Sequence, residues 1–264
     1  MSQPRGNGTN YPLVISAGIV VVAAVIAIVV GVNHAANVGV NRATPSPSLA
    51  TAAATASPSG SASASPSLVP FADCSTATFG SPLQPVNPPA DVHKYSAPPP
   101  MTIDTTKLYE ATITTARGNI VLCLQPQLAP NTVNVVVTLI RNHFYDGIPF
   151  HRVVSGFVIQ GGDPNCVGNV PAAPATPAAG CGSGGPGFTF NDEPVKQKYV
   201  QGCLAMANSG ANTNGSQFFI CTADDSSQLQ NLYNLFGKVQ NGMNVALQIQ
   251  QGDVMQSVTV TEQQ

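Results

Sequence analysis

Apolar and polar residues follow three different patterns along the chain, and the first is an apolar run near the N-terminus. Residues 13–32 are mostly apolar and carry no charge. A helix of that length is about 30 Å long, which matches the hydrocarbon core of a bilayer. We therefore expect a short cytoplasmic tail at residues 1–12 and an uncleaved anchor at residues 13–33; a cleaved signal sequence is the alternative. Arg5 favours a cytoplasmic N-terminus, which would place the rest of the chain outside.

The second pattern is a segment without hydrophobic periodicity. Residues 34–106 are rich in Ala, Ser and Pro, and their first part carries almost no charge. Such a segment buries too little apolar surface to offset its conformational entropy, so we expect a linker. Its second part adds Phe71, Cys74, Phe79 and Tyr95, and we expect parts of it to lie against the folded domain.

The third pattern, in residues 107–264, predicts the folded domain. Residues 108–114 alternate as a strand and residues 120–124 form its hairpin partner. Pro130 suits the first turn of a helix, and the apolar residues after it recur at helical spacing, namely Val133, Val136, Val137 and Ile140. We also predict a helix around residues 243–249 and strands at residues 188–191, 203–207, 216–221, 236–239 and 254–261. Short strands with two helices predict a closed antiparallel β-barrel capped by the helices.

Charge and cysteine content narrow the class of protein. Charged residues make up 8% of the chain and the net charge is −2, so no basic face is predicted for nucleic-acid binding. Six cysteines beyond an anchor indicate an oxidising compartment. No Cys-x-x-Cys spacing occurs, and no zinc site is predicted.

The cysteines suggest three pairs. Cys166 and Cys181 flank a Pro/Ala-rich insert, and a disulfide between them would join the ends of that loop. If the strands at residues 203–207 and 216–221 pair with the two cysteines opposite each other, Cys203 and Cys221 form either a cross-strand disulfide or two buried thiols. Cys74 and Cys123 would then remain as the third pair.

Residues 150–163 place one arginine and one glutamine in an otherwise apolar, β-prone run. Gly156 permits a bulge or bend that would let Arg152, Phe157 and Gln160 converge on one concave surface. The alternative is an ordinary core strand with a solvated arginine. We interpret His151 as structural, because no nucleophile-elbow motif accompanies it.

Residues 204–220 combine a loop rich in Asn and Gly with a strand. Asn214 and Gly215 supply positive backbone angles at low cost. Gln217 and Phe219 are two residues apart and therefore share one face of the strand. A core position for Phe219 is the alternative.

These stretches together resemble the cyclophilin family of peptidyl-prolyl isomerases. The resemblance covers residues 108–261 and is carried by FHRVVSGFVIQGGDP, GSGGPGFTFNDE, LAMANSGANTNGSQFFICT and LFGKV. It implies a closed eight-stranded antiparallel barrel with two helices, and an isomerase that acts on proline-containing polypeptides. The reaction needs no metal and no organic cofactor.

The resemblance also implies roles for individual residues. Arg152, Gln160 and Phe157 match catalytic positions. Gln217 would hydrogen bond near the arginine, and Gly182 would lie at the edge of the groove. The other residues expected to bind substrate are Val158, Ala207, Asn208, Ser209, Phe219, Leu229 and Tyr233.

Three positions depart from the family pattern. Val158 stands where many members have methionine, and Tyr233 where many have histidine. Gln228 falls where cyclosporin-sensitive members carry tryptophan, so we expect no strong cyclosporin binding while isomerase activity is retained.

The leading hypothesis is a monomeric, single-pass, membrane-anchored isomerase whose catalytic domain faces out of the cytoplasm and assists protein folding. The alternative is a non-catalytic module that binds proline peptides through the same groove and recruits envelope partners.

Overall fold

The computed structural model describes residues 68–168 and 180–264, and these belong to one compact unit. The predicted anchor, the cytoplasmic tail and the first part of the predicted linker lie outside the described residues. Within the described ranges, no helix is both long enough and apolar enough to cross a membrane.

The described chain contains eight strands, two α-helices and two short 3-10 helices. In chain order they are η1 (Cys74–Thr76), β1 (Tyr109–Thr115), β2 (Gly118–Leu124), α1 (Pro130–Arg141), β3 (Arg152–Val154), β4 (Val158–Gly161), η2 (Pro164–Cys166), β5 (Cys203–Met206), β6 (Phe218–Cys221), β7 (Leu235–Asn241), α2 (Met243–Ala246) and β8 (Ser257–Glu262).

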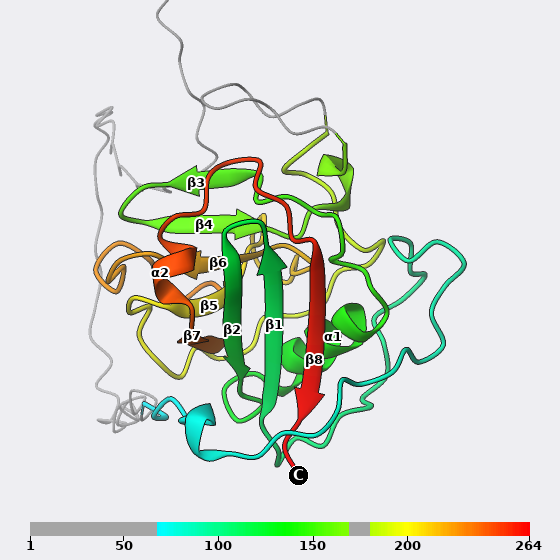
Figure 1. Cartoon of the computed structure of the whole chain (residues 1–264), viewed down its shortest axis with the longest axis horizontal. Helices are drawn as coiled ribbons and strands as arrows, with labels where there is room; N and C mark the ends of the chain where they lie inside the picture. The colour runs from blue at the N-terminus through cyan, green and yellow to red at the C-terminus, as the bar shows by residue number, and fades with distance from the viewer. Residues whose placement is uncertain (1–67, 169–179) are drawn as a thin grey trace, which may run out of the picture. The chain divides into compact units, whose positions relative to one another are not determined.

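All eight strands belong to one antiparallel sheet in the order β3-β4-β6-β5-β7-β2-β1-β8. Figure 1 shows β3 and β4 running across the direction of β1, β2 and β8, so the sheet is strongly curled. The fold is therefore mainly β with two helices, as the sequence predicts.

The ends of the sheet differ from the expected closed barrel. β3 and β8 are the two ends of the sheet and are not paired with each other in the described structure. The gap is bridged by irregular segments instead. The amide of Phe150 donates to the carbonyl of Asp253 at 2.8 Å, and the amide of Met255 donates to the carbonyl of Ile148 at 3.0 Å. The structure is a curled half-barrel whose open side is closed by loop hydrogen bonds.

The expected strand at residues 188–191 is also absent from the described structure. Only an isolated bridge joins Phe190 to Asn214. Side-chain hydrogen bonds replace the backbone pairing of a strand. Asn214 Nδ2 donates to the Phe190 carbonyl, and the Asp192 amide donates to Asn212 Oδ1. Asn side chains that bond to nearby backbone groups compete with regular strand pairing.

Helix α1 begins at Pro130, where the missing amide hydrogen costs nothing. The next two amides, of Asn131 and Thr132, donate to the carboxylate of Glu193 at 3.0 and 2.8 Å. Glu193 therefore satisfies free backbone donors and places a negative charge at the positive end of the helix.

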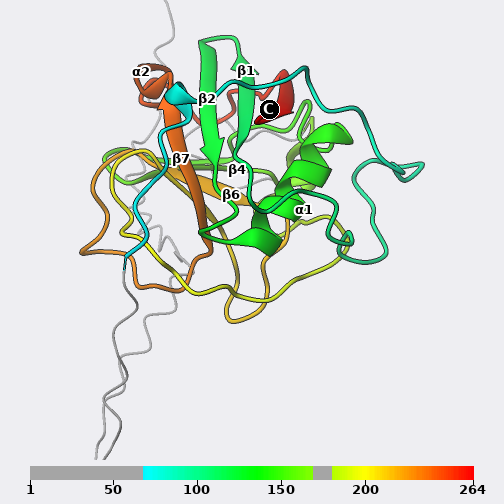
Figure 2. The ribbon, with the colours of Figure 1, turned by 90° about the horizontal axis from the view of Figure 1, so that it is seen from below.

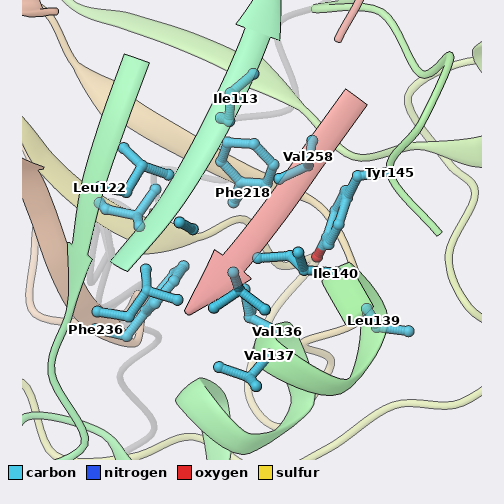
Figure 3. Close-up of a cluster of buried hydrophobic side chains, with 14 of the residues drawn as sticks. Ile113, Leu122, Val136, Val137, Leu139, Ile140, Tyr145, Phe218, Phe236 and Val258 are labelled. Carbon is cyan, nitrogen blue, oxygen red and sulfur yellow. The ribbon is translucent and has the colours of Figure 1, made fainter. Parts of the chain in front are cut away.

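The core lies between α1 and the concave face of the sheet. Figure 3 shows Val136 and Ile140 of α1 directed towards Phe218, Phe236 and Val258 from three strands. All five side chains are at least nine-tenths buried. Alternate residues of the strands point into this core, and the residues between them face the other side of the sheet.

Residues 68–106 lie along the outside of the sheet and helix (Figure 2). The amides of Gly80 and Leu83 donate to carbonyls of β8, at 2.9 and 2.8 Å, so the segment covers part of an edge strand. A disulfide joins Cys74 to Cys123 in β2. The structured unit therefore begins well before residue 107.

Replacing both Cys74 and Cys123 by alanine should lower the free energy of unfolding by about 2–4 kcal/mol, because the disulfide restricts the unfolded chain. The two residues are 49 positions apart. Urea unfolding of the variant beside the wild type measures the loss. Replacing Cys166 and Cys181, which are 15 positions apart, is the control and should cost about 1 kcal/mol less. Unchanged stability of the first variant would contradict a structural role for this disulfide.

Candidate active site

The predicted site residues meet in a row across four strands. Arg152 in β3 pairs with Gln160 in β4, and Gln160 pairs with Phe219 in β6. Phe219 in turn pairs with Ala205 in β5. Paired residues in a sheet point to the same face, so this register places an arginine, a glutamine and an aromatic ring side by side.

The turn between β3 and β4 creates the first part of this row. We expected Gly156 to permit a bulge or bend; it lies in the turn of a hairpin, with a φ of 69° that favours glycine. The amide of Phe157 donates to the carbonyl of Val154 at 3.1 Å and closes the turn. Residues 150–163 are thus a hairpin rather than one strand, and the chain reversal brings Gln160 opposite Arg152.

The register of β5 and β6 creates the second part. Leu204 pairs with Ile220, which confirms the pairing considered for the sequence and places Cys203 opposite Cys221. These two cysteines form a disulfide, and so do Cys166 and Cys181.

A chain of side-chain hydrogen bonds begins at the arginine. Arg152 Nη1 donates to Gln160 Oε1 at 3.4 Å, and Gln160 Nε2 donates to Gln217 Oε1 at 3.0 Å. Gln217 Nε2 then donates to the carbonyls of Gly184 at 2.8 Å and Gly182 at 3.2 Å. The two glutamines therefore connect the arginine to the glycine-rich loop at Gly182 and Gly184.

Asp163 fixes the far end of this series of hydrogen bonds, a role that sequence reasoning missed. Its carboxylate is fully buried and accepts hydrogen bonds from the amides of Asn165, Gly182 and Gly184. A Cβ atom at position 184 would collide with this carboxylate, so the close approach requires glycine. The only sequence signal for this role was the aspartate that ends the FHRVVSGFVIQGGD stretch. Its partners lie on a distant loop, so the sequence did not reveal them.

Apolar side chains cover the same face of the sheet beside the row. Val158, Phe219, Phe157, Leu229 and Tyr233 belong to one hydrophobic cluster, which we call the outer cluster. The Phe219 and Tyr233 rings are 5.5 Å apart and nearly perpendicular. The guanidinium carbon of Arg152 lies 5.9 Å from the centre of the Phe157 ring. The structure therefore gathers the predicted apolar residues next to the arginine.

Tyr199 supports the outer cluster, and sequence reasoning assigned it no role. Its ring is buried and lies 6.5 Å from that of Phe219. Its hydroxyl donates to the Tyr233 carbonyl at 2.7 Å and accepts from the Tyr233 amide at 3.1 Å. This contact spans separate loops, and a lone tyrosine in a polar stretch carries no pattern that would reveal it.

The predicted backbone contacts lie at the end of β5. The amide of Ala207 donates to the Gln217 carbonyl at 2.9 Å, while Asn208 Nδ2 donates to the Leu232 carbonyl at 2.8 Å. Ser209 is exposed. These bonds connect the Asn-rich loop to both sides of the site. Gln228, at the position where cyclosporin-sensitive members carry tryptophan, is also exposed to solvent.

Burial sets the electrostatics of the site. The pKa of Arg152 is lowered by burial, yet the guanidinium remains charged because its ordinary value is so high. Among the described residues, no ion pair involves Arg152. Burial also lowers the pKa of His151, which favours the neutral ring. The charge of Arg152 is therefore available to a partner outside the chain.

The comparisons with known proteins identify the family of this chain. The family model for the cyclophilin type peptidyl-prolyl cis-trans isomerase matches residues 110–264. The chain belongs to the cyclophilin family. It is 40% identical over 152 residues to a peptidyl-prolyl cis-trans isomerase of Helicobacter pylori, a match that covers 56% of this chain and 84% of that protein. Peptidyl-prolyl cis-trans isomerase B of Bacillus subtilis is also 40% identical, over 139 residues, which are 52% of this chain and 87% of the relative.

A solved cyclophilin type peptidyl-prolyl cis-trans isomerase of Cryptosporidium parvum is 28% identical, with a TM-score of 0.49 over 58% of this chain and 97% of that one. The present cyclophilin is a peptidyl-prolyl cis-trans isomerase, the activity for which its relatives are named.

A buried carboxyl beside the outer cluster makes stability depend on pH. Burial raises the pKa of Asp225 to about 6. Since the folded pKa exceeds the unfolded one, folding is opposed once the carboxyl ionises, and stability is lost as pH rises from about 4 to 6. Asp225→Asn should remove this loss and raise the free energy of unfolding at pH 7 by about 1–3 kcal/mol, with little change at pH 3.5.

Urea unfolding at several pH values measures the effect. Asp224→Asn is the matched control: this exposed carboxyl has a pKa lowered by hydrogen bonds from Ser226. Its charge is the smaller cause of the raised Asp225 pKa, after burial, so its replacement should leave most of the decline in place. A parallel pH dependence in Asp225→Asn and wild type would contradict the assignment.

Proposed function

We propose that this cyclophilin rotates X-Pro bonds at the row formed by Arg152, Gln160 and Phe219, with the prolyl ring held by the outer cluster. The observation that carries the proposal is the register, which places a fixed, unpaired cation next to an apolar surface on one sheet face. A proline peptide offers a matching pair of features, an apolar ring and an adjacent amide.

The chemistry of the amide explains the need for a cation. Rotation about a peptide bond is opposed by a barrier of about 18–20 kcal/mol, which arises from resonance between the nitrogen lone pair and the carbonyl. In the twisted transition state the lone pair is localised on the prolyl nitrogen. Arg152 can donate a hydrogen bond to that nitrogen only then, so the interaction stabilises the transition state selectively.

The glutamines position the guanidinium. Gln160 accepts from Arg152, and Gln217 holds Gln160 while it is itself bound to the Gly184 carbonyl. Because each side chain in the series is fixed by the next, the arginine is oriented before substrate binds. Preorganised donors avoid a reorganisation cost during the reaction.

The apolar residues hold the substrate. We assign Phe157, Val158, Phe219, Leu229 and Tyr233 to the prolyl ring, and the backbone of residues 207–209 together with Gly182 to the rest of the peptide. Exclusion of water by these side chains strengthens the arginine contact. The exposed, polar Gln228 supports the expectation that cyclosporin does not bind strongly.

We further propose that the enzyme is anchored in a membrane by residues 13–33 and assists folding outside the cytoplasm as a monomer. The uncharged run supports the anchor, and three disulfides support an oxidising compartment. Uncatalysed prolyl isomerisation takes about 10–100 s, slow enough to limit the folding of secreted proteins.

The alternative of a non-catalytic binding module is less well supported. Such a module would bind proline peptides through the outer cluster alone, and it would not need the hydrogen-bonded series that orients Arg152.

Arg152→Ala should lower kcat/KM for an Ala-Pro peptide at least tenfold, because the donor to the prolyl nitrogen is lost, and it should leave the fold intact. Arg152→Lys should also lose activity, since lysine lacks the rigid guanidinium fork. A protease-coupled assay measures turnover, with Arg141→Ala on α1 as the control. Full turnover by Arg152→Ala would contradict the assignment of Arg152. Peptide binding without turnover by the wild type would favour the binding module.

Gln217→Leu should lower kcat/KM about fivefold, corresponding to a loss of roughly 1 kcal/mol in the orientation of the series, since its hydrogen bonds to Gln160 and the glycine-rich loop are removed. Its matched control is Gln201→Leu, which removes an exposed glutamine bonded to the Thr222 carbonyl. Gln217→Leu should have a lower kcat than Gln201→Leu, while the KM values of the two variants should be the same. Equal activities would show that the glutamine series does not position the arginine.

A further inference from the structure

His151 stands next to Arg152 in the chain, but no step of the isomerase mechanism uses it. Its side chain is 4% exposed, and neither ring nitrogen has a hydrogen-bond partner among the described residues. Buried polar groups are almost always hydrogen bonded, and an unsatisfied one costs about 1–3 kcal/mol. Two unpartnered nitrogens on one buried ring therefore call for an explanation.

Two sulfur atoms lie beside this ring. The donor atoms of His151, Cys166 and Cys181 all lie within 4.8 Å of one another. Both cysteines are buried, at 0% and 7% exposure, and they form a disulfide. The three residues come from separate segments: one precedes β3, one ends η2, and one precedes the glycine-rich loop.

An imidazole nitrogen and two thiolates are a donor set that zinc prefers. Zinc binds thiolates at about 2.3 Å and imidazole nitrogens at about 2.0–2.1 Å with tetrahedral geometry. These lengths place neighbouring donor atoms roughly 3.5–3.8 Å apart, which falls within the observed 4.8 Å. The disulfide ties up both sulfurs, so the set becomes complete only after reduction.

We propose that the reduced protein binds one zinc ion through His151, Cys166 and Cys181. The site is thus a disulfide in one redox state and a metal centre in the other. The sequence spacing gives no hint of it, because the histidine comes from a different segment and no Cys-x-x-Cys pair is present.

The redox step is balanced by a dithiol reductant. The Cys166–Cys181 sulfur–sulfur bond breaks and takes up two electrons and two protons, and the reductant becomes a disulfide. When zinc binds, both thiols release their protons to solvent and form zinc–thiolate bonds. The zinc ion does not change its oxidation state.

The fourth zinc position is left to water. Asp163 acts electrostatically on His151, but its carboxylate is already bound by the amides of Asn165, Gly182 and Gly184. Three protein ligands with one open position are known for zinc. Since Cys181 adjoins Gly182, either the disulfide or the zinc ion would secure the loop that holds Gln217.

The test compares wild type with His151→Leu, using the full chain in detergent. The ring makes no hydrogen bond among the described residues, so leucine removes a ligand without breaking a hydrogen bond and the variant should fold. Both proteins keep all six cysteines. After reduction and removal of the reductant, zinc affinity is measured by competition with a chromophoric chelator, and cobalt is added as a spectroscopic probe of thiolate ligation.

Reduced wild type should bind one zinc ion per chain. Oxidised wild type and reduced His151→Leu should bind at least tenfold more weakly. The Cys203→Ser/Cys221→Ser variant, which keeps the proposed ligands, should match the reduced wild type. Equal zinc affinity in wild type and His151→Leu would overturn the proposal.

A second measurement does not depend on refolding after reduction. Both proteins are produced in a reducing cytosol with zinc present, and their metal content is measured. Wild type should carry zinc in a stoichiometric amount and His151→Leu at most a tenth of that. Wild type without zinc would also overturn the proposal.

Discussion

The candidate site depends on one constraint, the antiparallel register that runs from β3 through β4 and β6 to β5. A slip by one residue in β6 would turn Phe219 into the core and Phe218 out of it. The core prevents this slip, because Phe218 and Ile220 are buried in the core cluster while Phe219 belongs to the outer cluster. Hydrophobic burial on one face of the sheet thus determines which residues face the substrate on the other.

A second requirement is that the polar side chains on this face do not move. Arg152 is partly buried, and burial disfavours its charge. The series through Gln160 and Gln217 ends at Asp163, whose carboxylate is held by backbone amides. The position of the cation is therefore set by a fully buried carboxylate that lies just after β4. The same segment carries the Cys166–Cys181 disulfide, which connects redox chemistry to the support of the site.

Much of this arrangement was predictable from the sequence. The remainder was not predictable, and the reasons are physical. Local periodicity predicts the β1–β2 hairpin and the start of α1 at Pro130, since both depend on neighbours in sequence. The site residues follow from long motifs whose spacing is highly specific. The roles of Asp163 and Tyr199 depend on contacts between distant loops, and no local pattern encodes such contacts. Closure of the sheet was also mispredicted, because it depends on irregular backbone pairing around Phe150.

The central claim is that the prolyl ring lies on the outer cluster with Arg152 next to the prolyl nitrogen. A structure of the protein with a bound Ala-Pro peptide tests it most directly. The account predicts the ring against Phe219 and a guanidinium nitrogen within about 3.5 Å of the prolyl nitrogen, as a hydrogen bond would require. A peptide bound on another face, or an Arg152 directed away from the proline, would contradict it.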